Sequence, residues 1–328
     1  MERVRLDRRR KSSAAPLHHH LHLSTRPLSA MNTLHHGRSR NTQHATRNTF
    51  CAPRFNVLTS QRFNAFTLVE MLVVIAIIGI LASMILAVFP AIKKKAQITK
   101  SKQEIQNIVA AIYSYEHDYS QFPSSKAAKG VAALTPPDDF TFGTTNVSCL
   151  NPGGQTNTAE GFSTPNGLKT IRAPGNYQAN NSELIAILMD LEAFPNSAPT
   201  LNAGHVKNTN RTKYLSAPTV TGNISSGVGS DGVYRDPWGN PYIITLDLDS
   251  CQKTRDPLYR LPAVSADQAD SNNPKRGLNG LFYNADNNYK CYQNNTEVMV
   301  WSAGPDRLID QNTPANFGAN KDNVVSWK

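Results

Sequence analysis

The charge of this 328-residue chain is concentrated at its N-terminal end. The chain has 34 lysines and arginines against 24 aspartates and glutamates, a formal net charge of +10. Residues 1–65 hold twelve of the basic residues and two of the acids, so residues 66–328 carry 22 of each sign. A basic chain favours a nucleic-acid partner only when the charge lies on the folded part. We therefore expect no nucleic-acid partner.

Residues 1–65 are predicted to be a leader that is removed or disordered. They include seven of the nine histidines and show almost no apolar periodicity. The histidines between His18 and His22 could bind metal. The alternative is unstructured sequence, or sequence upstream of the true start codon, for which Met31 is a candidate.

The longest apolar stretch of the chain covers residues 66–92. Its sequence, FTLVEMLVVIAIIGILASMILAVFPAI, holds a single charge at Glu70, and Lys93–Lys95 follow it. A helix of about 20 apolar residues spans the hydrocarbon core of a bilayer. A plain membrane anchor is one interpretation. Glu70 favours a functional one, because a carboxylate in an apolar membrane helix is costly and rare without a role.

The flanks of this stretch resemble the N-terminal signal of type IV prepilins and type II secretion pseudopilins. Basic residues and the small Ala65 precede Phe-Thr-Leu-Val-Glu at 66–70. The resemblance implies that prepilin peptidase cuts after Ala65, where the family usually has Gly, and methylates the amino group of Phe66. It also implies that Glu70 is kept for assembly, where it can pair with the Phe66 ammonium of a neighbouring subunit. Leaving one such charge unpaired in low dielectric is heavily penalised.

Helical periodicity continues beyond Lys95. Apolar residues recur mainly at steps of three and four, which predicts an amphipathic helix packed on a domain. We expect one helix from about Thr67 to Tyr119, roughly 80 Å long at 1.5 Å per residue, with a kink at Pro90. The apolar positions of its second half are Ile98, Ile105, Ile108, Val109, Ile112, Tyr115 and Tyr119.

A loop-rich insertion is predicted at about residues 135–232, which are rich in Gly, Pro, Asn, Ser and Thr. Just before it, Gly130–Leu134 resembles the short helix that follows the long helix in the major pseudopilin of type II secretion. Within it, we expect a helix at Ser182–Glu192 with Ser182 as its N-cap. The apolar face of that helix would be Leu184, Ile185, Leu188 and Leu191.

Two strands are predicted in the C-terminal third. Asp236–Tyr242, with the sequence DPWGNPY, predicts a tight turn, and the β-branched run Ile243–Leu248 after it predicts a strand. This turn and strand are similar to those of the major pseudopilin. A second strand is expected at Glu297–Ser302, and a hairpin about Asn279–Gly280 between the two strands.

Together these elements predict an α+β pilin fold. A long N-terminal helix, membrane-spanning and then amphipathic, would pack on a small antiparallel β-sheet with a loop-rich insertion. The expected segments are a leader (1–65), a transmembrane and assembly helix (66–92), the amphipathic half of the same helix (93–122), and a periplasmic globular domain (123–328).

A calcium site is implied by the resemblance near the C-terminus. In the major pseudopilins, a Ser-x-Gly-x-Asp loop and a late Asp before a closing Trp hold calcium, an ion that takes six to eight oxygen ligands. The matching residues here are Ser302, Asp306, Asp310, Asp322 and Asn323. The alternative is a solvated loop of turn-forming Asp and Asn residues.

Three cysteines follow the leader, at positions 149, 251 and 291. An extracytoplasmic domain can form disulfides, and Cys251–Cys291 is the preferred of the three possible pairs. The sequence has no nucleophile elbow, P-loop, HExxH motif or dinucleotide-binding glycine motif. We expect a protein that is not an enzyme.

The resemblance implies a structural subunit of a type II secretion pseudopilus. It would be a single-pass protein of the bacterial inner membrane with its C-terminal domain in the periplasm, assembled through its N-terminal helix into a filament in the periplasm or at the cell surface. Its partners would be copies of itself, other pseudopilins, prepilin peptidase, and the inner-membrane secretion or pilus assembly platform. Two alternatives stay open: a type IV pilus subunit for adhesion, motility or DNA uptake, and a membrane-anchored binding domain that does not assemble.

Overall fold

The structure, a computed structural model, describes the chain from Ala65 onward with some gaps. The described residues are 65–144, 149–150, 156–157, 162–164, 167–169, 177–267 and 275–328. The predictions made for the leader, including those on its histidines and on Met31, lie outside them. So does most of the stretch between residues 145 and 176, including the side chain of Cys149.

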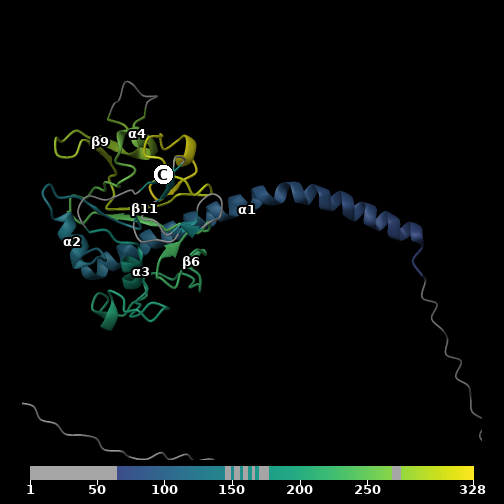
Figure 1. Cartoon of the computed structure of the whole chain (residues 1–328), viewed down its shortest axis with the longest axis horizontal. Helices are drawn as coiled ribbons and strands as arrows, with labels where there is room; N and C mark the ends of the chain where they lie inside the picture. Colours follow the sequence, from purple (N-terminus) through teal and green to yellow (C-terminus); the bar gives the residue numbers. More distant parts are fainter. Residues whose placement is uncertain are drawn as a thin grey trace, which may run out of the picture. The chain divides into compact units, whose positions relative to one another are not determined.

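The helix α1, Leu68–Tyr119, confirms the predicted long helix. Thr67 is its N-cap, and Thr67 and Glu70 form a capping box that satisfies backbone donors of the first turn. The helix passes Pro90 without a break and is curved along its length (Figure 1). Ser120 ends it in the left-handed conformation, with φ of 51° and its N–H donating to the Glu116 carbonyl.

The two halves of α1 differ in burial as predicted. Every residue from Phe66 to Ile92 is exposed. The second half buries one face against the domain, because its apolar positions recur with the helical period. The residues buried on that face are Ser101, Glu104, Ile105, Ile108, Ala111, Ile112 and Tyr115.

A four-stranded antiparallel sheet packs against the buried half of α1. Its order is β1-β8-β11-β12, and the strands are β1 (Phe140–Phe142), β8 (Ile243–Leu246), β11 (Val298–Ser302) and β12 (Val324–Val325). Leu246 of β8 lies opposite Phe140 on one side and Val298 on the other. A long helix on a small antiparallel sheet confirms the α+β fold.

The other described elements are short. The helices are α2 (Lys126–Ala132), α3 (Ser182–Leu188), α4 (Pro262–Ser265) and the 3-10 turns η1 (Ala203–His205), η2 (Leu278–Gly280) and η3 (Gly318–Asn320). Four two-stranded ribbons pair β2 (Cys149–Leu150) with β3 (Thr156–Asn157), β4 (Phe162–Thr164) with β5 (Gly167–Lys169), β6 (Gly227–Val228) with β7 (Tyr234–Arg235), and β9 (Phe282–Asn284) with β10 (Cys291–Gln293).

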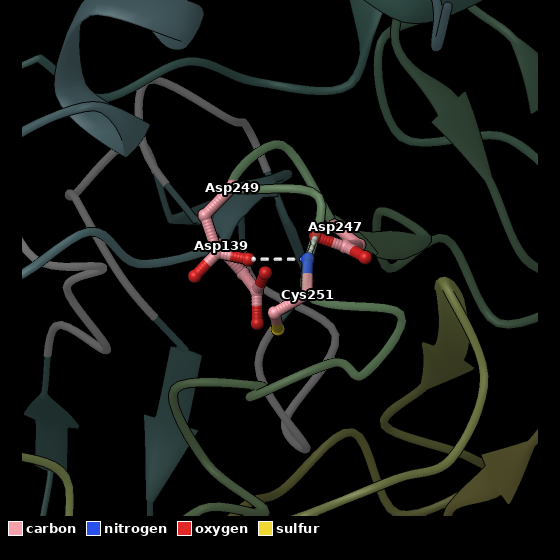
Figure 2. Close-up of side chains that lie close together, drawn as sticks. All are labelled: Asp139, Asp247, Asp249 and Cys251. Atoms are coloured by element: carbon pink, nitrogen blue, oxygen red, sulfur yellow. Dashed lines mark hydrogen bonds between the residues drawn. The ribbon is translucent and has the colours of Figure 1, made fainter.

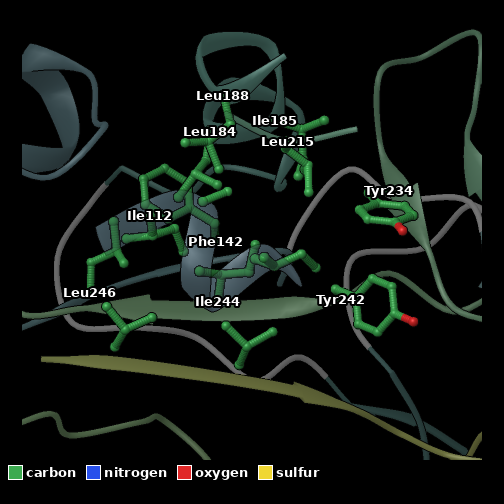
Figure 3. Close-up of a cluster of buried hydrophobic side chains, with 14 of the residues drawn as sticks. Ile112, Phe142, Leu184, Ile185, Leu188, Leu215, Tyr234, Tyr242, Ile244 and Leu246 are labelled. Carbon is green, nitrogen blue, oxygen red and sulfur yellow. The ribbon is translucent and has the colours of Figure 1, made fainter. Parts of the chain in front are cut away.

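Both faces of the main sheet are buried. Side chains alternate between the faces of a strand, so Ile244 and Leu246 pack with α1 and α3 in one cluster (Figure 3), whereas Ile243 packs in another. β11 alternates in the same way, with Val300 in the first cluster and Trp301 in the second. The second cluster is completed mainly by Leu258, Tyr259, Val264, Leu281, Met299, Ala303 and Ile309.

The structure corrects the predictions made for residues 135–232. Strand β1 lies in this region and supplies one edge of the main sheet, so the region is not only an insertion. Helix α3 ends four residues earlier than predicted, at Leu188. Its N-cap is Asn181 rather than Ser182, and the Ser182 N–H and hydroxyl both donate to the Asn180 side chain.

The turn before β8 forms as predicted. The Asp236 carboxylate accepts hydrogen bonds from the backbone N–H groups of Trp238 and Asn240, each at 2.9 Å. Gly239 takes a φ of 91°, a conformation that favours glycine. Asp236 also accepts a hydrogen bond from the Ser302 hydroxyl on β11, which joins the turn to the neighbouring strand.

The predicted hairpin about Asn279–Gly280 is also present. Both residues have positive φ, 57° and 81°, as a tight hairpin turn requires. On either side of the turn, Arg276 and Phe282 form an antiparallel bridge. This hairpin and β9 lie beside the second core cluster through Leu281.

Candidate functional site

The first half of α1 presents a continuous apolar surface. Among the described residues, α1 is the one helix long and apolar enough to cross a membrane by length and composition. Its large apolar side chains are about half exposed or more; Phe66 is 71% and Leu86 is 73% exposed. No charge interrupts the surface between Met71 and Ile92. Such a surface calls for lipid or other apolar helices around it.

The residues of the expected cleavage site lie just before this helix. Ala65 and Phe66 are exposed and precede the first helical turn. Within the described residues, both sides of the expected cleavage point are thus exposed.

Glu70 has its partners within its own chain. Its Oε2 accepts hydrogen bonds from the Thr67 N–H and the Thr67 hydroxyl, each at 2.8 Å. The Glu70 N–H donates to the Thr67 hydroxyl at 3.2 Å. The carboxylate is thus held at the very start of the helix, where the positive end of the helix dipole favours a negative charge.

Of the residues predicted to bind calcium, the structure brings Asp306 and Asp322 together. Their carboxyl groups lie close enough for each to affect the pKa of the other. Burial, with the neighbouring Asp322, raises the pKa of Asp306 to about 6. Burial also raises the pKa of Asp322, while Lys94 at the end of the apolar segment of α1 opposes both shifts. Two carboxylates held this close without a cation repel each other.

The surroundings of this pair fit a hard cation. The Oδ1 atoms of Asp322 and Asn323 are buried and accept no hydrogen bond within the described residues. Gly304, with φ of 71°, leaves room for the Asp322 carbonyl, which a Cβ at that position would meet at 2.3 Å. Carboxylate, amide and carbonyl oxygens are the ligands that calcium prefers.

The other two predicted ligands, Asp310 and Ser302, form hydrogen bonds elsewhere. Asp310 accepts hydrogen bonds from the Asn312 N–H at 3.0 Å and the Thr313 hydroxyl at 2.6 Å, both within its own loop. The Ser302 hydroxyl is engaged with Asp236. The structure therefore gathers Asp306, Asp322 and Asn323 as the centre of the candidate calcium site.

The predicted Cys251–Cys291 disulfide is wrong for this structure, in which both are free thiols. Cys251 is exposed, and its sulfur donates to the Lys253 carbonyl at 3.5 Å. Cys291 is buried on β10 and accepts from Arg260 at 3.9 Å. The two sulfurs thus belong to different environments, one at an exposed turn and one on a buried strand.

Sequence reasoning missed a group of acids around Cys251. One ligand atom from each of Asp139, Asp247, Asp249 and Cys251 lies within 4.8 Å of the others (Figure 2). The alternating Asp-x-Asp-x-Cys spacing at 247–251 was the available signal. Asp139 could not be found this way, because only the pairing of β1 with β8 brings it close.

Comparisons with known proteins agree with the N-terminal features. Residues 60–86 match the family model described as the prokaryotic N-terminal methylation motif. The chain is 35% identical over 71 residues to the type II secretion system core protein G of Pseudomonas aeruginosa. It is 33% identical over 70 residues to a fimbrial protein of Neisseria meningitidis and 32% identical over 75 residues to the type IV major pilin protein PilE1 of Neisseria gonorrhoeae.

These similarities cover the N-terminal part of the chain. They span 22% of this chain for the secretion protein, 21% for the fimbrial protein and 23% for the pilin. In the same order they cover 49%, 41% and 44% of the relatives' own lengths. No solved structure matches the chain.

Proposed function

Because this chain is prepilin-like, we propose that it is a structural subunit of a type II secretion pseudopilus. The observation that carries the proposal is the exposed apolar half of α1, with Glu70 at its start and the methylation motif over residues 60–86. A domain that needed only an anchor would gain nothing from a carboxylate at that position.

In the proposed pathway, prepilin peptidase cuts the Ala65–Phe66 bond and methylates the new amino group. The leader stays on the cytoplasmic side, as its twelve basic residues favour. The domain from residue 123 then lies in the periplasm. Cutting before the apolar segment keeps that segment on the mature protein, both as anchor and as assembly surface.

Assembly is proposed to exchange the partners of Glu70. In the single chain, Thr67 satisfies the carboxylate. In a bundle of packed helices, the ammonium of Phe66 on a neighbouring copy would be the stronger partner, because opposite charges attract strongly where water is excluded. The chain's partners would be its own copies, other pseudopilins and the inner-membrane assembly platform.

A type IV pilus subunit for adhesion, motility or DNA uptake is the second candidate. Similarity to the Neisseria proteins supports it as well as similarity to protein G supports secretion. The DPWGNPY turn and the Asp306–Asp322 pair favour secretion, since both resemble features of the major pseudopilin. We propose that Asp306, Asp322 and Asn323 hold calcium there, with Asp310 and the Ser302 carbonyl as further candidates. The chain would act structurally and not as an enzyme.

The test is mass spectrometry of the mature protein after co-expression with a prepilin peptidase. The expected product begins with N-methylated Phe66, and a catalytically inactive peptidase is the control. A cut after Ser83, as by a conventional signal peptidase, or an intact leader would contradict the proposal. Separate secretion and pilus assays in the host, each with the gene deleted, would then distinguish the two filament types.

A further inference from the structure

The acids around Cys251 form a second group with metal-binding chemistry, distinct from the Asp306–Asp322 pair. In the antiparallel pairing of β1 and β8, Phe140 lies opposite Leu246. The next residue outward on each strand is an aspartate, Asp139 and Asp247, so the register places two carboxylates side by side. Like charges in that position destabilise a sheet unless something neutralises them.

The turn after β8 adds two more ligand groups. The Cys251 N–H donates to Asp247 and to Asp249, at 3.1 Å each, which folds the turn back over the strand ends. Figure 2 shows the Asp139 carboxylate lying between the Asp249 carboxylate and the Cys251 side chain. Three oxygens and one sulfur thus converge within 4.8 Å of one another.

Arginines neutralise only part of this charge. Arg255 Nε lies 3.0 Å from Asp138 and 3.3 Å from Asp139, and its guanidinium also pairs with Asp249. Arg260 pairs with Asp138 at 2.7 Å. No lysine or arginine in the described part of the chain pairs with Asp247. Four carboxylates therefore face two guanidinium groups, an excess of two negative charges.

An independent sign of a missing partner comes from Asp139 itself. Its side chain is fully buried, with 0% of its surface exposed. Its Oδ2 accepts from the Arg255 N–H at 2.6 Å, but its Oδ1 has no hydrogen-bond partner within the described residues. A buried carboxylate oxygen left unsatisfied is strongly unfavourable, so this oxygen requires a cation or a proton.

We infer that Asp139, Asp247, Asp249 and Cys251 bind a zinc ion. The ion adds two positive charges and Cys251 gives up one proton, so the excess at the site falls from two negative charges to one. The sulfur selects the metal, because thiolate favours zinc, whereas calcium and magnesium prefer sites made only of oxygen. Four ligands match the coordination number of structural zinc sites.

Zinc binding releases one proton from the site. The Cys251 thiol gives up its hydrogen bond to Lys253 and releases its proton to solvent as the sulfur–zinc bond forms. Two of the ligands face solvent: Cys251 is exposed, and Asp247 lines an open cavity of about 460 Å³ together with Ser250 and Gln252.

The test uses the full chain in detergent, stripped of metal and then dialysed against zinc or cobalt. Zinc content per chain is measured by mass spectrometry of the metal, in the wild type, in Cys251→Ser and in Asp139→Asn. We expect the wild type to hold one zinc more than either variant. We also expect each substitution to lower the zinc affinity of this site at least tenfold. Removing a residue that only hydrogen-bonds a metal ligand already costs about tenfold or more, and these substitutions remove a ligand itself. Histidines in residues 1–65 bind equally in all three proteins, so the difference isolates this site.

Cobalt supplies the second measurement. A thiolate bound to cobalt gives a charge-transfer absorption band, which we expect in the wild type and not in Cys251→Ser. Asp306→Asn, in the other acidic pair, is the matched control and should keep the band. Because Cys251 is exposed, its serine variant should fold even if Asp139→Asn does not. Equal zinc contents with no cobalt band, or calcium displacing cobalt at equal concentration, would overturn the inference.

Discussion

At the scale of single residues, Glu70 has two separable roles. It completes the capping box of α1, and in the proposed filament it supplies the charge that meets a neighbouring amino terminus. The substitutions Glu70→Ala and Glu70→Gln separate these roles, because Gln can still form a capping box but carries no charge.

We predict that both Glu70 variants lose filament assembly. An ammonium left without its partner in a water-poor interface costs about 3–5 kcal/mol. Assembly is measured by cross-linking and by electron microscopy of sheared filaments. Gln103→Ala, at an exposed position of the same helix outside the apolar segment, is the control and should assemble normally. Normal filaments from Glu70→Gln would mean that only the cap matters, and normal filaments from both variants would favour a plain anchor.

Asp236 is a buried carboxyl whose burial sets a pH dependence. Burial raises its pKa to about 6, although Ser302, Asn240 and Trp238 donate hydrogen bonds that oppose the shift. The folded state therefore binds a proton more tightly than the unfolded state, whose aspartate titrates near 3.8. Protonated Asp236 therefore stabilises the folded state. This stabilisation is complete below about pH 4 and is lost as pH rises through about 6.

We predict that Asp236→Asn flattens this part of the stability profile. The substitution removes up to roughly 3 kcal/mol of change in unfolding free energy between about pH 4 and pH 6, at about 1.4 kcal/mol per unit of pKa shift. The measurement is urea unfolding of the full chain in detergent at several pH values. Asp286→Asn, on an exposed loop, serves as control and should leave the profile unchanged. Identical profiles for Asp236→Asn and wild type over this range would rule out the assignment.

At the scale of elements, the two halves of α1 differ in their surroundings: the first half is exposed and the second half buries one face against the domain. We predict that Ile108→Ala, in the buried half, lowers the unfolding free energy of the domain by about 2–5 kcal/mol, because it leaves a cavity between α1 and the sheet. Ile85→Ala, in the exposed half, should change it by no more than about 0.5 kcal/mol. Tryptophan fluorescence reports this unfolding, since all three tryptophans lie between residues 238 and 327. Equal effects of the two substitutions would mean that the apolar half also packs on the domain.

Elements with strong local signals were predictable from the sequence. The helical period and the DPWGNPY turn are each encoded within a few residues, and each forms as expected. The N-cap of α3 was not predictable in this way. The Asn181 amide donates to the Tyr234 and Tyr242 carbonyls at 2.9 and 2.8 Å, so its side chain serves tertiary contacts and not the helix end.

Sites built by strand pairing were the harder part. β1 has only three residues, too few for a period to show, and its position beside β8 follows from the whole fold. The sequence could therefore suggest the C-terminal acids, which lie near one another in the chain, but not the contact of Asp139 with Asp247. The expected disulfide also failed: Cys251 and Cys291 both flank the loop region between the predicted strands, but this did not make them a bonded pair.

At the scale of the whole molecule, the chain closes with a loop after β11 in which Phe317 is 69% exposed and the Asn320 amide donates to the Asp310 and Thr313 carbonyls at 2.6 Å each. We predict that calcium stabilises the domain, by about 2.7 kcal/mol at a hundredfold excess over its dissociation constant. For a domain of this size, that is roughly a 5–10 °C rise in melting temperature. The full chain is melted in detergent with calcium and with a chelator.

Variants locate the calcium effect. Asp306→Ala and Asp322→Ala should each abolish the rise, because the structure holds these two carboxyl groups together. Asp286→Ala should leave the rise intact. Identical melts of the wild type with calcium and with chelator would show that these aspartates are solvated turn residues. A rise that survives both substitutions would mean that calcium acts at another site.

The edges of the main sheet affect whether neighbouring copies of the domain could pair through their strands. Its outer strands, β1 and β12, have three and two residues, so each edge offers few free N–H and C=O groups. Short edges of this kind resist the addition of foreign strands. In a crowded filament, where neighbouring domains would meet at very high local concentration, this geometry discourages amyloid-like stacking. In the proposed filament, contacts between copies would then be left to the apolar first half of α1.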